Sequence, residues 1–421
     1  MKSMKKTTIP KDKCLDNTFK LILEGYLFIP NRCRKYRSDL FQTRMMGQKV
    51  ICMSGESAAK LFYDKIRFTR KGAIPKRIQK TLFGVKAIQT LVGADHKNRK
   101  SLFVSFMTPS RIDHLVAIMR KEWQLSSRRW MEKERIVLFD EACAMLCRAA
   151  CRWSGVPLKK SEVKQRAMDL SAMIDAFGAV GPRYWKGKCA RKRTEMWMKN
   201  MIREVRRGRL TPPHDSILQK IAFHKDRHGK LLEANIAGIE MINILRPITA
   251  IATYITFGAL AMEFHPECRV KIKEREGNYL HMLAQEIRRY FPFGPFLGAR
   301  VRSDFIYHNF RFKKGTLTFL DIYGTNHDSR IWKKPYRFLP EHFKFKDGNP
   351  YDFIPQGGGD METGTRCPGE WITMELLKDS MDFLANNLEY RVPLQDLNYS
   401  LRRMPTLPKS RFIMENIVRK D

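Results

Sequence analysis

The 421-residue chain is 43% hydrophobic and 11% aromatic, and its 25 glycines and 20 prolines are spread along its length. This composition excludes a disordered, collagen-like or repeat protein, and without a linker-like stretch it predicts a single domain over residues 1–421. The 79 Lys and Arg residues exceed the 43 Asp and Glu residues, so the formal net charge is +36. That surplus favours anionic partners, but no nucleic-acid-binding motif accompanies it. We expect a solvated basic surface, no nucleic acid partner and at most a weak contact with an anionic membrane surface.

The cysteine pattern indicates where the protein works. Nine cysteines form no CxxC pair, and an odd number in a long chain predicts a reducing compartment. The longest apolar run, near 248–262, is interrupted by threonines and is shorter than a membrane span. We therefore expect a cytoplasmic protein. Cys143, Cys147 and Cys151 recur every four residues without a nearby fourth ligand, so we assign them to the core of a helix and expect no metal there.

In chain order, the hydrophobic pattern predicts a helix and then strands near 40–55, followed by an α-rich stretch over 56–292. Segment 233–264 is apolar nearly all round, which is typical of a helix in the centre of a large protein. Pro247 lies inside it, where a proline costs ~3 kcal/mol by removing a backbone hydrogen bond. Residues 296–325 alternate as strands do, and a Gly-rich loop at 354–370 leads into a helix. The predicted fold class is mainly α with small β-sheets (α+β).

Ordered motifs occupy the C-terminal half. Glu286 and Arg289 are three residues apart and share one helix face, and the segment Phe338-Leu-Pro-Glu-His-Phe343 follows. The Gly-rich loop lacks the Lys-Ser/Thr of a P-loop and the spacing of a dinucleotide fold, which disfavours a nucleotide site. The loop carries Cys367 just before a helix, and a helix N-terminus supplies N–H groups and positive potential that stabilise a thiolate.

This ordered set resembles the C-terminal half of the cytochrome P-450 family, in which a cysteine thiolate ligates haem iron. The chain departs from the family at Gln356, where Phe is usual, by extra residues between Gly359 and Cys367, and at His342, where Arg is common. The elongated loop is similar to that of the bacterial fatty-acid peroxygenases, the branch that uses hydrogen peroxide. Similarity to this branch extends along the chain, in segments 15–28, 74–84, 175–188, 245–251, 288–299, 321–328 and 354–360.

The resemblance implies a cytochrome P-450 fold with haem b (iron protoporphyrin IX) buried between the long central helix and the cysteine loop. It makes Cys367 the iron ligand and Glu286 and Arg289 structural residues. His96 and Lys100, four residues apart on one helix face, are expected to contact the haem propionates, unless they are simply solvated. Phe83 and Gln89 are expected to overlie the haem and Phe293 to line the pocket, although ordinary packing would explain these residues equally.

The central helix carries Arg246-Pro247 where ordinary monooxygenases of the family have an acid-alcohol pair. An arginine in an apolar helix is costly unless it is paired, and its planar fork matches a carboxylate. The resemblance implies that Arg246, Pro247 and Gln89 form the catalytic set and that Arg246 and Phe83 bind substrate. The substrate is then a long-chain fatty acid whose own carboxylate acts as general acid and base toward hydrogen peroxide, with no redox partner. Pairing of Arg246 with a protein acid is the alternative.

Attack at the alpha and beta carbons is expected, because these carbons lie nearest a carboxylate anchored above the haem. Two other functions remain open: oxidative decarboxylation of fatty acids to terminal alkenes, and non-catalytic binding of fatty acid or haem at an anionic membrane. Alkene-forming relatives carry histidine at the position of Gln89, whose amide cannot titrate. Hydroxy acids are therefore expected as the main products.

Overall fold

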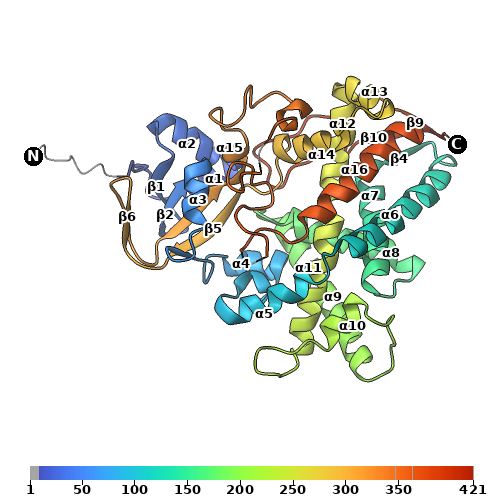
Figure 1. The fold of residues 1–421 in the computed structure, drawn as a ribbon, viewed down its shortest axis with the longest axis horizontal. Helices are drawn as coiled ribbons and strands as arrows, with labels where there is room; N and C mark the ends of the chain where they lie inside the picture. Colours follow the sequence, from blue (N-terminus) through green and yellow to red (C-terminus); the bar gives the residue numbers. More distant parts are fainter. Residues whose placement is uncertain (1–8, 347, 363, 421) are drawn as a thin grey trace, which may run out of the picture.

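The computed structural model describes residues 9–346, 348–362 and 364–420 (Figure 1). The basic residues 1–8 and residue 363 of the expected ligand loop lie outside the described residues. A small β-rich part contains the N-terminal elements, and a larger α-rich part contains the C-terminus (Figure 1). The expected fold class, mainly α with small sheets, is confirmed by this arrangement.

The two strands near 40–55 and two of the strands within 296–325 belong to one sheet. Its order is β1-β2-β8-β5-β3. The hairpin β1–β2 pairs Leu40 with Met53, β8 joins β2 in parallel from Val50 opposite Leu317, and β5 pairs antiparallel with β8. The bounds are β1 (Leu40–Met45), β2 (Gln48–Met53), β3 (Phe68–Thr69), β5 (Phe296–Val301) and β8 (Leu317–Asp321).

The strand-like pattern was misleading at its C-terminal end. Residues 322–326 form helix α15 (Ile322–Asn326), because the Asp321 carboxylate accepts a hydrogen bond from the Gly324 N–H at 2.9 Å and caps the helix. Two smaller sheets complete the strands: the pair β6 (Phe305–Tyr307) and β7 (Phe310–Phe312), and a sheet ordered β4-β10-β9, with β4 (Arg135–Val137), β9 (Leu388–Arg391) and β10 (Ile413–Arg419).

Local signals set the helix ends. Pro109 lies in the first turn of α6, and α7 ends at Gly155, whose φ of 77° an L-residue rarely adopts. The helices are α1 (Thr18–Glu24), α2 (Phe28–Tyr36), α3 (Glu56–Phe62), α4 (Lys76–Ile78), α5 (Gly93–Val104), α6 (Pro109–Trp130), α7 (Leu138–Ser154), α8 (Val163–Asp175), α9 (Pro182–Arg206), α10 (Ile217–Ala222), α11 (Ala234–Ala250), α12 (Ala252–Phe264), α13 (Glu267–Lys273), α14 (Tyr279–Tyr290) and α16 (Glu370–Asn386), with short turns η1 (Gly25–Leu27), η2 (Gln79–Phe83), η3 (Ile88–Thr90), η4 (Lys160–Glu162) and η5 (Pro340–Phe343).

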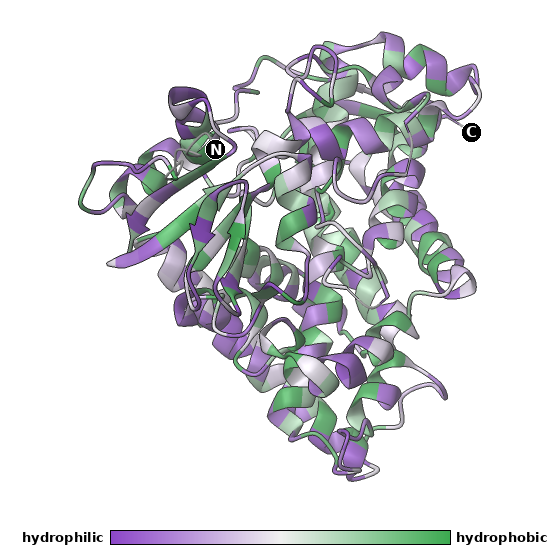
Figure 2. Cartoon of the chain, turned by 60° about the vertical axis from the view of Figure 1, so that its left-hand side comes forward, coloured by the Kyte–Doolittle hydropathy of each residue, from purple (hydrophilic) through white to green (hydrophobic). Residues whose placement is uncertain are grey.

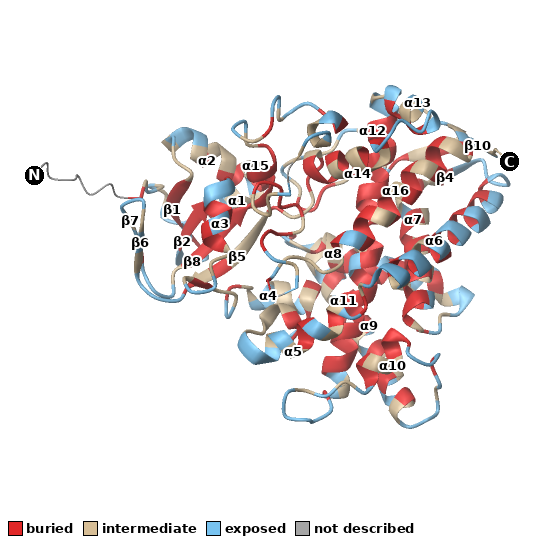
Figure 3. Ribbon diagram, in the orientation of Figure 1, coloured by how far each residue is buried: buried red, intermediate tan, exposed pale blue. Residues whose placement is uncertain are grey.

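The apolar central segment forms two consecutive helices, α11 and α12, which meet at Ile251, four residues after Pro247. They pack against α7, α9, α14 and α16, so buried residues concentrate along the middle of the α-rich part (Figure 3). Hydrophobic residues follow these inner segments, and hydrophilic residues lie mainly on the outer faces of the peripheral helices (Figure 2). The stretch Ala234–Phe264 is long and apolar enough to cross a membrane, but 89% of its most apolar window is buried inside the protein. It is therefore placed as a core helix.

Candidate active site

The Gly-rich loop holds Cys367 at the start of α16. The Cys367 N–H donates to the Gln356 carbonyl at 3.1 Å. This hydrogen bond closes the loop, and the extra residues of the elongated loop belong to the segment between its two ends. The Gly359 N–H donates to the Pro350 carbonyl at 2.9 Å, and a Cβ on Gly358 would lie 2.6 Å from the same oxygen. A glycine is required at residue 358 for this close approach.

The cysteine thiol has mixed surroundings. Burial raises the pKa of Cys367, whereas the Gly369 N–H, the charge of Lys100 and the Gln356 side chain lower it. These groups are the donors and the cation that would stabilise a thiolate once iron is bound to it.

Cations gather beside the cysteine loop. Lys100 on α5 is buried, and its Nζ donates to the Arg366 carbonyl at 2.8 Å. Burial lowers the pKa of Lys100, and the nearby Cys367 raises it. His96, one turn earlier on α5, is half-buried, and burial together with the charges of Lys100 and Lys65 lowers its pKa. Lys100 thus reaches the cysteine loop, and His96 lies beside Lys100 on α5. Contact of the two residues with haem propionates stays a prediction.

Glu286 and Arg289 form a fully buried ion pair on α14. The Arg289 Nε and Nη2 each donate to a carboxylate oxygen of Glu286 at 2.7 Å. The remaining donors of Arg289 reach the carbonyls of Asn326, Pro335 and Arg337. The pair therefore joins α14 to the irregular segment that precedes the cysteine loop.

Arg246 is the buried cation of the central helix. Its side chain is on α11, 6% of the residue surface is exposed, and its Nη2 donates to the Asn243 Oδ1 at 3.2 Å. Its Nε is buried without a hydrogen-bond partner, and its guanidinium lies 5.5 Å from the centre of the Phe83 ring. Burial and the charge of Arg191 together lower the pKa of Arg246 to about 9, and Cys367 opposes part of this shift. The side chain remains cationic at neutral pH. Within the described residues, it makes no ion pair with a carboxylate.

Gln89 and Pro247 are the other two members of the catalytic set that the sequence predicts. The Oε1 of Gln89 is buried without a hydrogen-bond partner. Pro247 is exposed although the residues on both sides of it are buried. Gln89 thus has an unpaired acceptor, and Pro247 has an uncovered apolar ring.

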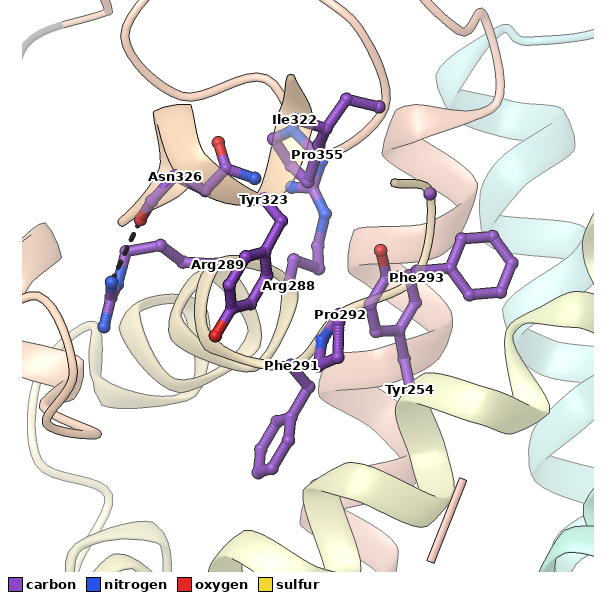
Figure 4. A pocket seen from close by; sticks show the side chains of 11 residues that line it. Tyr254, Arg288, Arg289, Phe291, Pro292, Phe293, Ile322, Tyr323, Asn326 and Pro355 are labelled. Atoms are coloured by element: carbon purple, nitrogen blue, oxygen red, sulfur yellow. Dashed lines mark hydrogen bonds between the residues drawn. The ribbon is translucent and has the colours of Figure 1, made fainter. Parts of the chain in front are cut away.

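Phe293 lies shortly after the end of α14. Its ring lies 5.3 Å from the Tyr254 ring, and its carbonyl accepts from the Tyr26 hydroxyl at 2.6 Å. Phe293 and Tyr254 line a small pocket with Arg288 and Arg289, and the Phe293 ring points away from these arginines (Figure 4). The pocket has room for about 10 Å³, which suits at most one water molecule. This pocket is therefore not a substrate site.

The residues fit a haem. Gln89, Arg246 and Gln356 carry orphaned polar atoms, Pro247 is exposed and Cys367 is partly exposed. Arg246 and Pro247 belong to the central helix and Gln356 and Cys367 to the cysteine loop, the two segments that enclose haem in the expected fold, and Gln89 belongs to the segment expected to overlie it. A thiolate-bearing loop, an apolar central helix and flanking cations match an iron-bearing macrocycle with acidic propionates. No cluster of three His, Cys, Asp or Glu side chains suited to another metal occurs among the described residues.

Comparison with known proteins identifies the class that this fold and site define. A cytochrome P-450 family model matches residues 275–396. Curated relatives include the protopanaxadiol 6-hydroxylase of Panax ginseng, 22% identical over 381 residues that cover 83% of this chain and 79% of that protein, and the taxoid 2-alpha-hydroxylase of Taxus canadensis, 21% identical over 93% of this chain and 85% of that protein. The chain is a haem-thiolate oxidoreductase of the cytochrome P-450 fold.

Solved structures narrow the class. Cytochrome P450EX alpha (CYP152N1), solved with myristic acid, is 42% identical, with a TM-score of 0.95 over 98% of this chain and 100% of that chain. Cytochrome P450SP alpha (CYP152B1), solved with (R)-ibuprofen, is 40% identical, with a TM-score of 0.93 over 96% and 99%. A variant of cytochrome P-450 OleT with arachidonic acid is 36% identical, with a TM-score of 0.96 over 99% of both chains. The chain belongs to the CYP152 fatty-acid peroxygenase family, and its cofactor is haem b.

The structure adds polar residues that the motif analysis missed. Glu240 and Asn243 lie on α11, six and three residues before Arg246 respectively, and both are buried. Glu240 pairs with Arg99 of α5. A charged residue inside an apolar helix was the available signal for Glu240, since such residues require a partner.

Proposed function

We propose that the chain hydroxylates long-chain fatty acids at the alpha and beta carbons with hydrogen peroxide. The observation that carries the proposal is Arg246, a buried guanidinium whose hydrogen-bond partner is the neutral Asn243 amide. A buried cation without a counter-ion is costly, and a fatty-acid carboxylate would match its planar fork. The solved relatives with myristic and arachidonic acid support a substrate of this class.

Haem bound through the Cys367 thiolate would supply the oxidising chemistry. Arg246 would hold the substrate carboxylate through two parallel N–H donors. The segment Leu245–Ala250 contains no acidic side chain, so the held carboxylate oxygen is the group that accepts and returns the peroxide proton. Arg246 stays protonated throughout and fixes this carboxylate in place, which keeps carbons two and three nearest the reacting oxygen.

The test is incubation of the holoprotein with myristate and hydrogen peroxide, without a reductase, followed by mass spectrometry. The expected products are 2- and 3-hydroxymyristate. Methyl myristate is the matched control, because it has the same chain and no ionisable carboxylate. Equal turnover of ester and acid would contradict the proposal.

Terminal alkenes would indicate oxidative decarboxylation instead. Gln89 favours hydroxylation because its amide does not ionise near neutral pH, whereas a histidine could donate or accept a proton. Gln89→His is therefore expected to raise the alkene fraction. An unchanged product ratio in this variant would remove Gln89 from the control of products.

A further inference from the structure

A row of buried polar side chains runs along one face of α11. Glu240, Asn243 and Arg246 follow one another at intervals of three residues, so they share a face. The Asn243 Nδ2 donates to the Glu240 Oε2 at 3.0 Å, and the Arg246 Nη2 donates to the Asn243 Oδ1 at 3.2 Å. The amide thus uses its donor toward the carboxylate and its acceptor toward the guanidinium.

The carboxylate of this row is matched elsewhere. The Glu240 Oε1 accepts from the Arg99 Nη1 at 2.5 Å and from the Ile88 N–H at 3.0 Å. Glu240 is fully buried, and 8% of the Arg99 side chain is exposed. Burial raises the pKa of Glu240, and Arg99 opposes that rise. The charge of Glu240 is therefore compensated by α5 at the end of the row away from Arg246.

The positive charge of Arg246 remains uncompensated as a result. A second arginine, Arg191, lies near enough to Arg246 to lower its pKa. Arg191 itself pairs with Glu195 at 2.6 Å and donates to the Leu82 carbonyl. Glu240 of α11 and Glu195 of α9 thus each pair with an arginine, whereas Arg246 has an amide as its partner. A buried charge in this state gains most from an anionic ligand.

We propose that Asn243 sets the preference for an ionised acid over a neutral lipid. Its amide orients the Arg246 guanidinium and separates it from Glu240, so the site keeps one net positive charge for the substrate carboxylate. This inference rests on the proposed role of Arg246. Asn243 acts through Arg246 and is a positioning and specificity residue. An acidic side chain of the same shape at residue 243 would give Arg246 an internal counter-ion.

The test compares the binding of myristate and methyl myristate to the holoprotein, by titration of the Soret band without peroxide. In Asn243→Asp, myristate affinity is expected to fall by at least about tenfold, equivalent to ~1.4 kcal/mol, while methyl myristate affinity stays within about threefold. Asn243→Ser is the matched neutral control. It loses part of the positioning contact and is expected to keep the preference for the acid. A purely structural role would weaken acid and ester alike in both variants.

In Asn243→Asp the new carboxylate would lie next to that of Glu240. The double variant Glu240→Gln/Asn243→Asp therefore leaves one acid in the row, and the same loss of preference for the acid is expected. An unchanged preference in the Asp variants, or a lost preference in Asn243→Ser, would overturn the role of Asn243. Arg246→Ala separates this result from the proposed function. If Arg246→Ala still prefers acid over ester, the carboxylate anchor itself is wrong. If it loses the preference and Asn243→Asp does not, only the inference about Asn243 fails.

Discussion

Replacement of Glu286 by Gln removes the negative charge from an ion pair in which neither side chain is exposed. The Glu286 oxygens accept two bonds of 2.7 Å from Arg289 and one of 2.8 Å from the Leu339 N–H. A glutamine keeps one acceptor, but its NH₂ would face a guanidinium that only donates. Arg289 would become an uncompensated buried charge, and breaking a buried pair in this way costs about 3–5 kcal/mol.

Glu204→Gln is the matched control, because Glu204 and Arg207 have the same residue types and spacing, with side-chain exposures of 38% and 59%. A surface pair of this kind contributes about 0–1 kcal/mol. Urea unfolding of the holoproteins, followed by far-UV circular dichroism and linear extrapolation, gives the two differences in unfolding free energy. If Glu286→Gln costs no more than Glu204→Gln, the Glu286–Arg289 pair does not stabilise the fold as the geometry indicates.

Other predictions concern the site and the sheet. Cys367→Ala is expected to abolish the thiolate-type ferrous-CO band, whereas Cys268→Ala should retain it; a band that survives in Cys367→Ala would exclude this ligand. Arg246→Ala is expected to lower peroxide-driven turnover of myristate by about a hundredfold or more, and Arg246→Lys to restore part of it, since a point charge cannot replace the fork. Product formation by mass spectrometry checks both, and equal recovery by Lys would contradict a bidentate contact. Burial raises the pKa of Asp321 to about 7, so its contribution to stability is complete below about pH 4 and is lost as pH rises through 7, by up to about 1.4 kcal/mol per pH unit. Asp321→Asn, which can still cap α15, should remove this slope from unfolding curves measured between pH 4 and 8, and an unchanged slope would assign it to another group.

Periodicity located most helices because an amphipathic or fully apolar pattern is a local property. The helix expected to carry Cys143, Cys147 and Cys151 is α7 (Leu138–Ser154), and the helix expected after the Gly-rich loop is α16 (Glu370–Asn386). The pattern failed at 322–326, where the Asp321 side chain bonds the backbone and a short helix replaces the expected strand. Strand pairing was also beyond a local pattern, since β2 and β8 are more than 260 residues apart and form their ladder only after the chain folds.

The sequence by itself determined that Arg246 is a charge within an apolar helix, that Cys367 begins a helix after a Gly-rich loop, and that Glu286 and Arg289 share a face. These facts depend on residue type and spacing along one element. The same spacing puts Glu240, Asn243 and Arg246 on one face, but it leaves undecided which arginine neutralises Glu240. The tertiary structure decided this by bringing Arg99 of α5 to Glu240 of α11 across 141 residues of sequence. Because a carboxylate pairs with the cation that packing brings within reach, Arg246 keeps its charge for a ligand.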